Sequence, residues 1–381
     1  MKYDLKTRCI HGECRSDDNR PFGAITTPIF QSATFAHPGI GHSTGYDYSR
    51  ESNPTRSELE HVMSSLEGAA DTVACSSGMA AVSLCMELFE PGSHFVCTND
   101  LYGGSVRMFQ QMEERRGFSF TYVDTSDAEA AAAAVTPRTR ALYIETPSNP
   151  TMRVTDLAEM KRLAEKHHLL LIVDNTFLSP YLQTPIALGA DLVIHSGTKF
   201  LGGHNDVLAG FVCAARKELA ERIRYLYKSV GSCLAPFDSF LMLRSIKTLA
   251  VRMECQQRNA LTIARWLKQH QKVSQVYYIG LPEHPGHEIQ KRQASGFGGM
   301  ISFRTDTAQT ARDVLSRVRL ISYAESLGGV ESLITYPMLQ THGDVPVDVR
   351  EALGITDTFL RLSVGIESVE DLIADLEQAL A

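Results

Sequence analysis

Short apolar runs recur along the first two thirds of the chain, with helix-like stretches between them. From about residue 56 these runs are TVAC (72–75), HFVC (94–97), SFTYV (119–123), ALYI (141–144), LLLIV (169–173), DLVIH (191–195) and LAGFVC (208–213). Short runs that stay apolar without alternation are typical of strands buried on both faces. The pattern therefore predicts an α/β fold with a seven-stranded, mostly parallel sheet covered by helices on both sides.

One stretch contains the strand–helix–strand unit in its clearest form. Between ALYI and LLLIV a helix is predicted near residues 156–167, with Thr155 or Asp156 as its N-cap. Its expected buried face consists of Leu157, Met160 and Leu163. We interpret this stretch as one right-handed crossover between neighbouring parallel strands.

The pattern changes on either side of this region. Residues 1–55 lack sustained periodicity and are rich in Gly, Pro, Ser and Thr, which predicts an extended arm laid on another surface. After about residue 245 a long amphipathic helix runs through Trp266, followed by further apolar runs and a helical C-terminus. We therefore expect an arm (1–55), a large domain (56–245) and a smaller C-terminal α+β domain (246–381).

Composition and charge narrow the class of protein. The chain has 37 Lys plus Arg and 44 Asp plus Glu, a formal net charge of −7, so neither nucleic acid nor a membrane surface is an expected partner. No apolar run is long enough to span a bilayer, and the charged N-terminus lacks the core of a signal peptide. These features, with eight scattered cysteines expected to be reduced, predict a cytoplasmic protein.

Polar residues follow three of the predicted strands, where ligands bind in open α/β sheets. A carboxylate follows LLLIV, two hydroxyls and an amine follow DLVIH, and a turn that starts a helix follows TVAC. These residues are Asp174; Ser196, Thr198 and Lys199; and Ser77, Gly78 and Met79. Backbone N–H groups at a helix start favour phosphate, and Tyr102 in DLYGG adds an aromatic ring. Pyridoxal phosphate (PLP) needs such an amine, carboxylate, phosphate cradle and ring, so the combination predicts PLP.

Longer motifs match a known family. They are YDYSRESNPTR, ACSSGMAA, DLYGGSVRMF, IETPSNP, VDNTF, HSGTKFLGGHNDVLAG, ESLGGVESL and LRLSVGIE. In this order and spacing they resemble the PLP-dependent enzymes of cysteine and methionine metabolism, the trans-sulfuration enzymes, over essentially the whole chain. The resemblance implies PLP fold type I, which is aspartate aminotransferase-like, and a homotetramer built from two tight dimers.

The same resemblance implies roles around the cofactor. Lys199 resembles the lysine that forms the Schiff base, Asp174 the partner of the pyridine nitrogen, and Tyr102 the stacked ring. The expected phosphate-binding residues are Ser77, Gly78, Met79, Ser196 and Thr198. On the arm, Tyr48 and Arg50 resemble the pair that reaches the phosphate site of a neighbouring subunit, which would explain why the arm has no core of its own.

Further positions resemble those that bind the substrate. Arg361 resembles the clamp for the α-carboxylate, with Ser326 and Asn149 as helpers, and Asn149 is also expected beside the cofactor. Positions that resemble those around the distal end of the substrate are Arg107, Glu325, Asp47 and Gly104. Gly104 stands where methionine γ-lyases resemble one another in having cysteine. Together the four favour a dipolar distal group over a plain thioether.

These likenesses lead us to expect α,γ-elimination of L-cystathionine, as in cystathionine γ-lyases. Lys199 is the expected proton shuttle, and Tyr102 is a candidate acid or base at the leaving sulfur. The alternatives are γ-replacement on O-acylhomoserine with cysteine, then cystathionine β-lyase or methionine γ-lyase activity. Lyases and synthases share the motifs, and residues 335–355 depart from the segments typical of each branch.

Hypotheses from other functional classes have less support in the sequence. A non-catalytic, PLP-binding regulatory protein is disfavoured because Lys199, Tyr102 and Arg361 are all present. Clusters with metal-ligand spacing, none of them a closed ligand set, are Cys9, His11 and Cys14, and His284 with His287. No metal is therefore expected. GFGG does not complete a nicotinamide-binding fingerprint, and SGTK has the wrong order for a P-loop.

Overall fold

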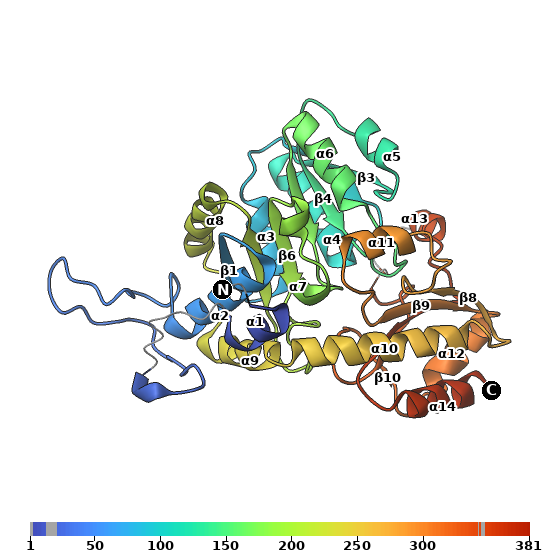
Figure 1. The fold of residues 1–381 in the computed structure, drawn as a ribbon. Helices are drawn as coiled ribbons and strands as arrows, with labels where there is room; N and C mark the ends of the chain where they lie inside the picture. The colour runs from blue at the N-terminus through green and yellow to red at the C-terminus, as the bar shows by residue number, and fades with distance from the viewer. Residues whose placement is uncertain (1–2, 13–20, 342, 344–346) are drawn as a thin grey trace.

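The computed structural model describes residues 3–12, 21–341, 343 and 347–381 (Figure 1). Its larger sheet has the strand order β1-β7-β6-β5-β4-β2-β3 and is parallel except for β7. The strands are β1 (Asp71–Cys75), β2 (His94–Thr98), β3 (Ser119–Val123), β4 (Thr139–Glu145), β5 (Leu170–Asp174), β6 (Leu192–Ser196) and β7 (Gly210–Ala214). Each of the seven apolar runs forms one strand, which confirms the predicted sheet.

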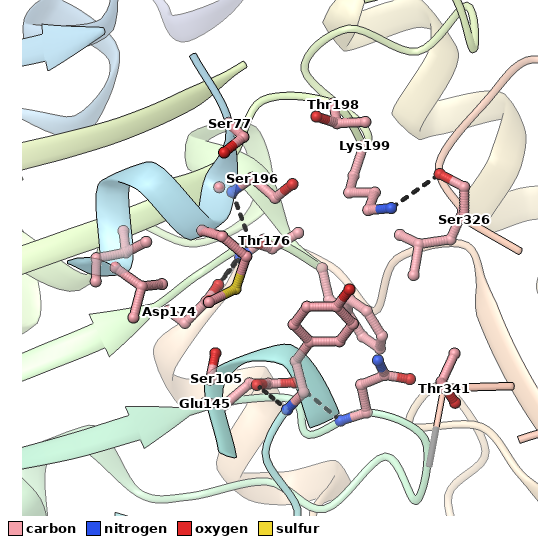
Figure 2. Close-up of a pocket in the computed structure, with 18 of the residues that line it drawn as sticks. Ser77, Ser105, Glu145, Asp174, Thr176, Ser196, Thr198, Lys199, Ser326 and Thr341 are labelled. Atoms are coloured by element: carbon pink, nitrogen blue, oxygen red, sulfur yellow. Dashed lines mark hydrogen bonds between the residues drawn. The ribbon is translucent and has the colours of Figure 1, made fainter. Parts of the chain in front are cut away.

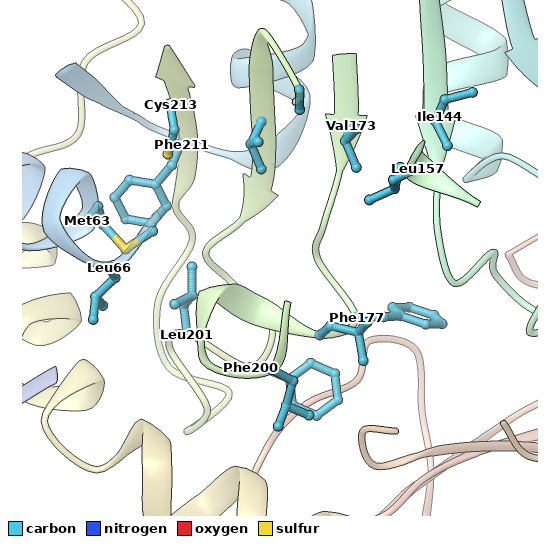
Figure 3. Close-up of a cluster of buried hydrophobic side chains, with 14 of the residues drawn as sticks. Met63, Leu66, Ile144, Leu157, Val173, Phe177, Phe200, Leu201, Phe211 and Cys213 are labelled. Carbon is cyan, nitrogen blue, oxygen red and sulfur yellow. The ribbon is translucent and has the colours of Figure 1, made fainter. Parts of the chain in front are cut away.

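Both faces of this sheet are buried, because successive side chains of a strand point to opposite faces. In β5, Leu171 and Val173 belong to one apolar cluster and Ile172 to the other. Helices α2 (Pro54–Glu67) and α6 (Leu157–His167) contribute to the first cluster, and α3 (Gly78–Met86), α4 (Gly103–Arg116) and α8 (Lys217–Val230) to the second. Figure 3 shows part of the first cluster, where Met63 and Leu66 of α2 approach Phe211 of β7.

The crossover between β4 and β5 matches the prediction. The Asp156 carboxylate caps α6 by accepting hydrogen bonds from two backbone N–H groups of its first turn, at 2.9 and 3.3 Å. Asp156, and not Thr155, is therefore the N-cap. The buried face contains Leu157, Met160 and Leu163, as expected.

A second, smaller sheet forms the C-terminal part, with the strand order β10-β11-β12-β9-β8. Its strands are β8 (Val273–Tyr277), β9 (Met300–Thr305), β10 (Ser322–Tyr323), β11 (Leu333–Thr335) and β12 (Phe359–Ser363). The long helix α10 (Leu249–Leu267) connects the two parts. Leu249 and Met253 pack in the core of the large sheet, whereas Ile263 and Leu267 pack in the core of the small one.

The remaining helices are short or flank these cores. They are α1 (Leu5–His11), η1 (Pro21–Gly23), α5 (Ala128–Ala133), α7 (Ser179–Leu182), η2 (Pro185–Leu188), α9 (Pro236–Ile246), α11 (His287–Gln293), α12 (Ala308–Arg317), α13 (Val347–Ala352) and α14 (Val369–Leu380). Within the described part of the chain, no helix combines the length and apolarity needed to cross a membrane.

The N-terminal region is extended for most of its length. Residues 24–53, all of them described, form no helix and no strand, and the chain runs out from the body as a long loop (Figure 1). Ile25 and Ile40 on this loop are 85% and 104% exposed. The beginning differs from the expected arm, because α1 packs against α2 and buries Cys9.

Candidate active site

A cavity lies where several strands of the large sheet end and the small sheet approaches. Twelve of the residues selected from the sequence line it: Ser77, Gly78, Met79, Tyr102, Asn149, Asp174, Ser196, Thr198, Lys199, Glu325, Ser326 and Arg361 (Figure 2). Asp174 and Ser196 are the last residues of their strands, and Lys199 follows in the turn after β6. The topology thus brings together residues from distant parts of the chain.

Lys199 is a partly buried amine within this cavity. Its Nζ donates a hydrogen bond to the Ser326 Oγ at 2.9 Å (Figure 2). Burial, followed by the positive charge of Arg361, lowers the pKa of Lys199 to about 8. A substantial fraction of this amine is therefore neutral, and able to act as a nucleophile or base, at a mildly alkaline pH.

Asp174 supplies a carboxylate at the end of β5. Its Oδ1 accepts hydrogen bonds from the backbone N–H and the hydroxyl of Thr176, at 3.0 and 2.6 Å. The Thr176 hydroxyl oxygen in turn accepts the backbone N–H of Ser196 at 2.9 Å, which links the ends of β5 and β6. Burial raises the pKa of Asp174, while the bonds from Thr176 oppose that shift.

The start of α3 forms a concave backbone surface in the cavity wall. A Cβ atom on Gly78 would lie 2.9 Å from the Cβ and Oγ of Ser196, so a side chain there has no room. The Ser77 Oγ caps the helix by accepting the backbone N–H of Ala80 at 3.1 Å. The N–H groups of Gly78 and Met79 in this first turn have no acceptor within the helix, so they are available to an anion.

Arg361 on β12 is fully buried on the small-sheet side of the cavity. Its guanidinium donates to the Asn149 Oδ1 at 2.8 Å, to the Ser326 carbonyl at 2.9 Å and to the Thr335 hydroxyl at 3.1 Å. Burial lowers its pKa to about 10, so it stays charged at neutral pH. Its buried Nε has no hydrogen-bond partner among the described residues. The site therefore presents a fixed cation with donor capacity left for an acidic ligand.

Tyr102 lines the cavity, and Gly104 lies against its ring. Tyr102 precedes α4, is 43% exposed, and donates its backbone N–H to the Glu145 Oε2 at 3.0 Å. A Cβ on Gly104 would lie 2.5 Å from the Tyr102 ring. Glycine at position 104 is therefore what allows the ring to occupy its place at the cavity.

Besides Gly104, four residues selected from the sequence do not line this cavity within a single chain. Tyr48 and Arg50 lie on the extended loop, with the Arg50 guanidinium 5.5 Å from the centre of the Tyr48 ring. Asp47, on the same loop, lies 3.3 Å from the His37 Nε2. Arg107 is exposed on α4. The arm residues thus have the exposure expected of groups that meet another surface.

Several residues of the cavity were not predicted from the sequence. Glu145, Ser105, Thr176 and Thr341 all line it. Glu145 was detectable, because it directly follows the ALYI run and so obeys the rule that selected Asp174. Ser105 and Thr341 carry no such signal, since one lies inside a helix and the other in a loop.

The positions considered for a metal have other environments. The Nδ1 atom of His284 accepts the backbone N–H of Gly286 at 3.1 Å, and the Nδ1 atom of His287 lies 2.8 Å from the Ile279 carbonyl. Cys9 is buried, and Cys14 lies outside the described residues. Across 3–12, 21–341, 343 and 347–381, no three His, Cys, Asp or Glu side chains are grouped to hold a metal ion.

Comparisons with known proteins agree with this geometry. The profile of a family described as "Cys/Met metabolism PLP-dependent enzyme" matches residues 6–381. The chain is 48% identical to a cystathionine gamma-lyase of Bacillus subtilis, with 98% of both chains covered. It is 46% identical to a cystathionine beta-lyase of Lactococcus lactis subsp. cremoris, over 99% of this chain and 98% of that protein.

A solved structure adds a third activity to these similarities. The crystal structure of a cystathionine gamma synthase from Xanthomonas oryzae pv. oryzae in complex with cystathionine matches with a TM-score of 0.96 and 42% identity. The match covers 100% of this chain and 98% of that one. Proteins named for three different reactions are therefore similar to this chain at nearly equal levels.

Proposed function

The chain belongs to the Cys/Met-metabolism PLP-dependent enzymes, and we propose that it cleaves the Cγ–S bond of L-cystathionine by α,γ-elimination. The observation that carries the choice of substrate is a cavity lined by the buried cation Arg361 and the carboxylate of Glu325, and similarity to the Bacillus subtilis gamma-lyase supports the choice of the Cγ–S bond. L-Cystathionine has an amino-acid group at each end. One end therefore has a carboxylate for Arg361, and the other has an ammonium for Glu325.

The cavity fits the cofactor of this family. Lys199 brings an amine, Asp174 a partly buried carboxylate, and the start of α3 a backbone surface for phosphate at which Gly78 has no room for a side chain. Bound PLP supplies an aldehyde that joins to amines and a ring that accepts electrons from the substrate α-carbon. We propose that Lys199 holds the aldehyde, Asp174 the ring nitrogen and Tyr102 the ring face.

The phosphate group has its own set of proposed partners. They are the residues of the α3 start and of the turn after β6: Ser77, Gly78, Met79, Ser196 and Thr198. The Thr198 hydroxyl oxygen accepts the backbone N–H of Ala209 at 3.1 Å, so its position is fixed before any ligand binds. Such pre-organisation reduces the ordering that binding requires.

The substrate carboxylate is assigned to Arg361. Asn149 and the Ser326 carbonyl already hold two of its guanidinium nitrogens, so the fork is oriented before the substrate arrives. The substrate α-carbon then lies near Lys199, whose amine donates a hydrogen bond to the Ser326 side chain. Lys199 is thereby placed to take the α-proton and to return it at another carbon.

Loss of the sulfur completes the proposed reaction. The Cγ–S bond breaks, its electron pair stays on sulfur, and a proton delivered to that sulfur gives cysteine. Tyr102, at the cavity wall, is the proposed donor of this proton. One water then replaces the amine, so the remaining products are 2-oxobutanoate and ammonia.

A second copy of the chain is part of the proposal. Asp47, Tyr48 and Arg50 occupy one exposed stretch of the extended loop, so an arm laid on a neighbour carries all three together. We propose that they complete the neighbour's cavity, with Asp47 and Arg107 near the distal end of the substrate. This arrangement requires at least a dimer, and we propose a homotetramer of two such dimers.

We also propose that the protein is cytoplasmic. The described cysteines are all free thiols, which is usual where the surroundings are reducing. Cell fractionation with an antibody to the chain tests this, and recovery outside the cytoplasm contradicts it.

Product analysis tests the proposed reaction. The purified protein with PLP is incubated with L-cystathionine, and the products are resolved by mass spectrometry. Cysteine with 2-oxobutanoate is the expected result, whereas homocysteine with pyruvate means cleavage on the β side. A parallel reaction with an O-acylhomoserine and cysteine tests γ-replacement, which similarity to the Xanthomonas synthase supports as the second candidate. Turnover of that pair alone overturns the lyase proposal.

A further inference from the structure

Glu145 is a buried carboxylate that none of the proposed steps uses. It ends β4, is 7% exposed and lines the cavity. Its Oε2 accepts the backbone N–H of Tyr102 at 3.0 Å, and its Oε1 accepts the backbone N–H of Asn149 at 3.2 Å (Figure 2). One side chain thus binds the main chain of two separate cavity loops.

A second carboxylate repeats the arrangement in the opposite direction. Asp100, fully buried on the loop after β2, accepts hydrogen bonds through its Oδ2 from the Ser148 hydroxyl at 2.7 Å and the Thr151 N–H at 3.1 Å. The Thr151 hydroxyl also donates to this oxygen. The loop after β2 therefore binds the loop after β4, while Glu145 binds back to the loop after β2.

The two loops carry groups with different proposed roles. One bears the Tyr102 ring, and the other bears the Asn149 amide, whose Oδ1 accepts a hydrogen bond from Arg361 at 2.8 Å. Resting on the proposed cofactor site, but not on which C–S bond breaks, we propose that Glu145 is a positioning residue. Its two backbone hydrogen bonds set the distance between the Tyr102 ring and the Asn149–Arg361 pair.

The surroundings of Glu145 indicate that this role depends on its hydrogen bonds and not on a negative charge. Glu145 is paired in register with the partly buried Asp174 on the neighbouring strand, so two carboxyl groups lie side by side. Burial and the charge of Asp174 raise the pKa of Glu145 well above its usual range, against the two N–H bonds. A neutral glutamine is therefore compatible with the local charge, but its amide nitrogen cannot accept an N–H bond.

Glu145→Gln and Glu145→Ala in the PLP-loaded enzyme test the proposal. In Glu145→Gln one of the two loops loses its acceptor, and in Glu145→Ala both do. We expect the visible circular dichroism of bound PLP to change in both variants, because it reports the ring's surroundings. We expect kcat/KM for L-cystathionine to fall about tenfold in Glu145→Gln and about a hundredfold in Glu145→Ala, with KM raised through the Asn149–Arg361 pair.

Asp375→Asn is the matched control. Asp375 on α14 is also 7% exposed and accepts backbone N–H groups, from Arg319, Leu320 and Ile321, at 2.9–3.2 Å, but lies outside the cavity. The Asp375→Asn variant should have a lower Tm and an unchanged circular dichroism of bound PLP. If Glu145→Gln behaves like this control, with unaltered dichroism and KM, the positioning role is overturned.

A ligand titration keeps this test separate from the proposed reaction. Glycine, which has the α-amine and α-carboxylate but no sulfur, is titrated against each PLP-loaded protein by absorbance. Weaker glycine binding in Glu145→Gln than in wild type and Asp375→Asn supports positioning, even if wild type does not cleave L-cystathionine. Equal glycine affinity in all three proteins contradicts it. Should Glu145→Ala fail to fold, Glu145→Gln still decides the outcome.

Discussion

The amine of Lys199 donates a hydrogen bond to the hydroxyl of Ser326 at 2.9 Å, although the two residues are 127 positions apart. Ser326 has a φ of 87°, in a left-handed region that costs a non-glycine residue about 1–3 kcal/mol. Arg361 holds the carbonyl of the same serine at 2.9 Å. The proposed carboxylate clamp thus fixes the residue on which the lysine rests, and the two functional groups share one support.

Replacing Lys199 tests its assignment. Lys199→Ala should lower kcat about a hundred- to ten-thousandfold, because it removes the proposed proton shuttle. It should also remove the visible absorbance of the covalently held cofactor. Borohydride treatment followed by peptide mass spectrometry should find the cofactor on Lys199 in wild type. Lys217→Ala, at an exposed lysine, is the control. Cofactor found on any lysine other than Lys199 would refute the assignment.

The lowered pKa of Lys199 predicts how the cofactor-free protein captures PLP at different pH values. Only the neutral amine attacks the aldehyde, and its pKa is about 8 instead of the usual 10.5. The capture rate should therefore rise about tenfold per pH unit below pH 8 and level off above it. Stopped-flow absorbance between pH 6 and 10 measures this, with N-acetyl-lysine as the reference amine. A rate that keeps rising in parallel with the reference shows an unshifted amine.

Arg361→Lys tests the carboxylate clamp. Lysine keeps the positive charge but cannot reproduce the planar fork that contacts Asn149, Ser326 and Thr335. KM for L-cystathionine should rise about ten- to hundredfold, since hydrogen bonds to charged groups contribute about 1.5–3 kcal/mol each. Steady-state kinetics measure the effect, with the half-exposed Arg317→Lys as control. An unchanged KM means that the carboxylate binds elsewhere.

Glu325→Gln tests recognition of the distal ammonium. It removes the charge but keeps the size of the side chain, so KM for L-cystathionine should rise about tenfold from the loss of a charged hydrogen bond. KM for a sulfur amino acid without a distal ammonium, such as L-homocysteine, should rise much less. The ratio of the two KM values is the measurement. Equal changes for both compounds indicate that Glu325 acts on the shared α-amino end.

Mixing two inactive variants tests whether the arm completes a neighbour's site. Arg50→Ala lacks the arm contribution and Lys199→Ala lacks the amine, so each alone should be inactive. Subunits unfolded together and refolded as a mixture should regain activity, because a mixed dimer has one intact site. Random pairing restores about a quarter of the sites. If the mixture stays as inactive as each variant alone, Arg50 does not contribute to the site of a neighbouring subunit.

The periodic part of the sequence predicted the fold in detail. The seven apolar runs became seven strands because continuous apolar residues fit a sheet buried on both faces, and Asp156 capped its helix through local backbone bonds. The rule of polar residues after strands found Asp174 and Lys199 but passed over Glu145. Glu145 falls inside a motif, IETPSNP, whose asparagine was selected alone.

The distal end of the cavity shows where the sequence was insufficient. Glu325 lines the cavity, whereas Asp47 and Arg107 lie outside it in the single chain. Their proposed contribution requires the arm of another copy to pack at this site, and periodicity in the sequence does not predict such packing. Proteins named as lyases and as a synthase are similar to this chain at 42–48% identity, so overall sequence similarity does not select one of these reactions.

The sequence by itself determined the strand runs, the local caps and the chemical types of the groups at the strand ends, because these follow from short-range periodicity and hydrogen bonding. Tertiary structure alone decided that Lys199 rests on Ser326, that Arg361 reaches Asn149 across the two sheets, and that Glu145 joins two loops. Three of these four contacts link residues 43 to 212 positions apart, whereas the bond from Asn149 to Glu145 spans four. Their geometry exists only once both cores have packed.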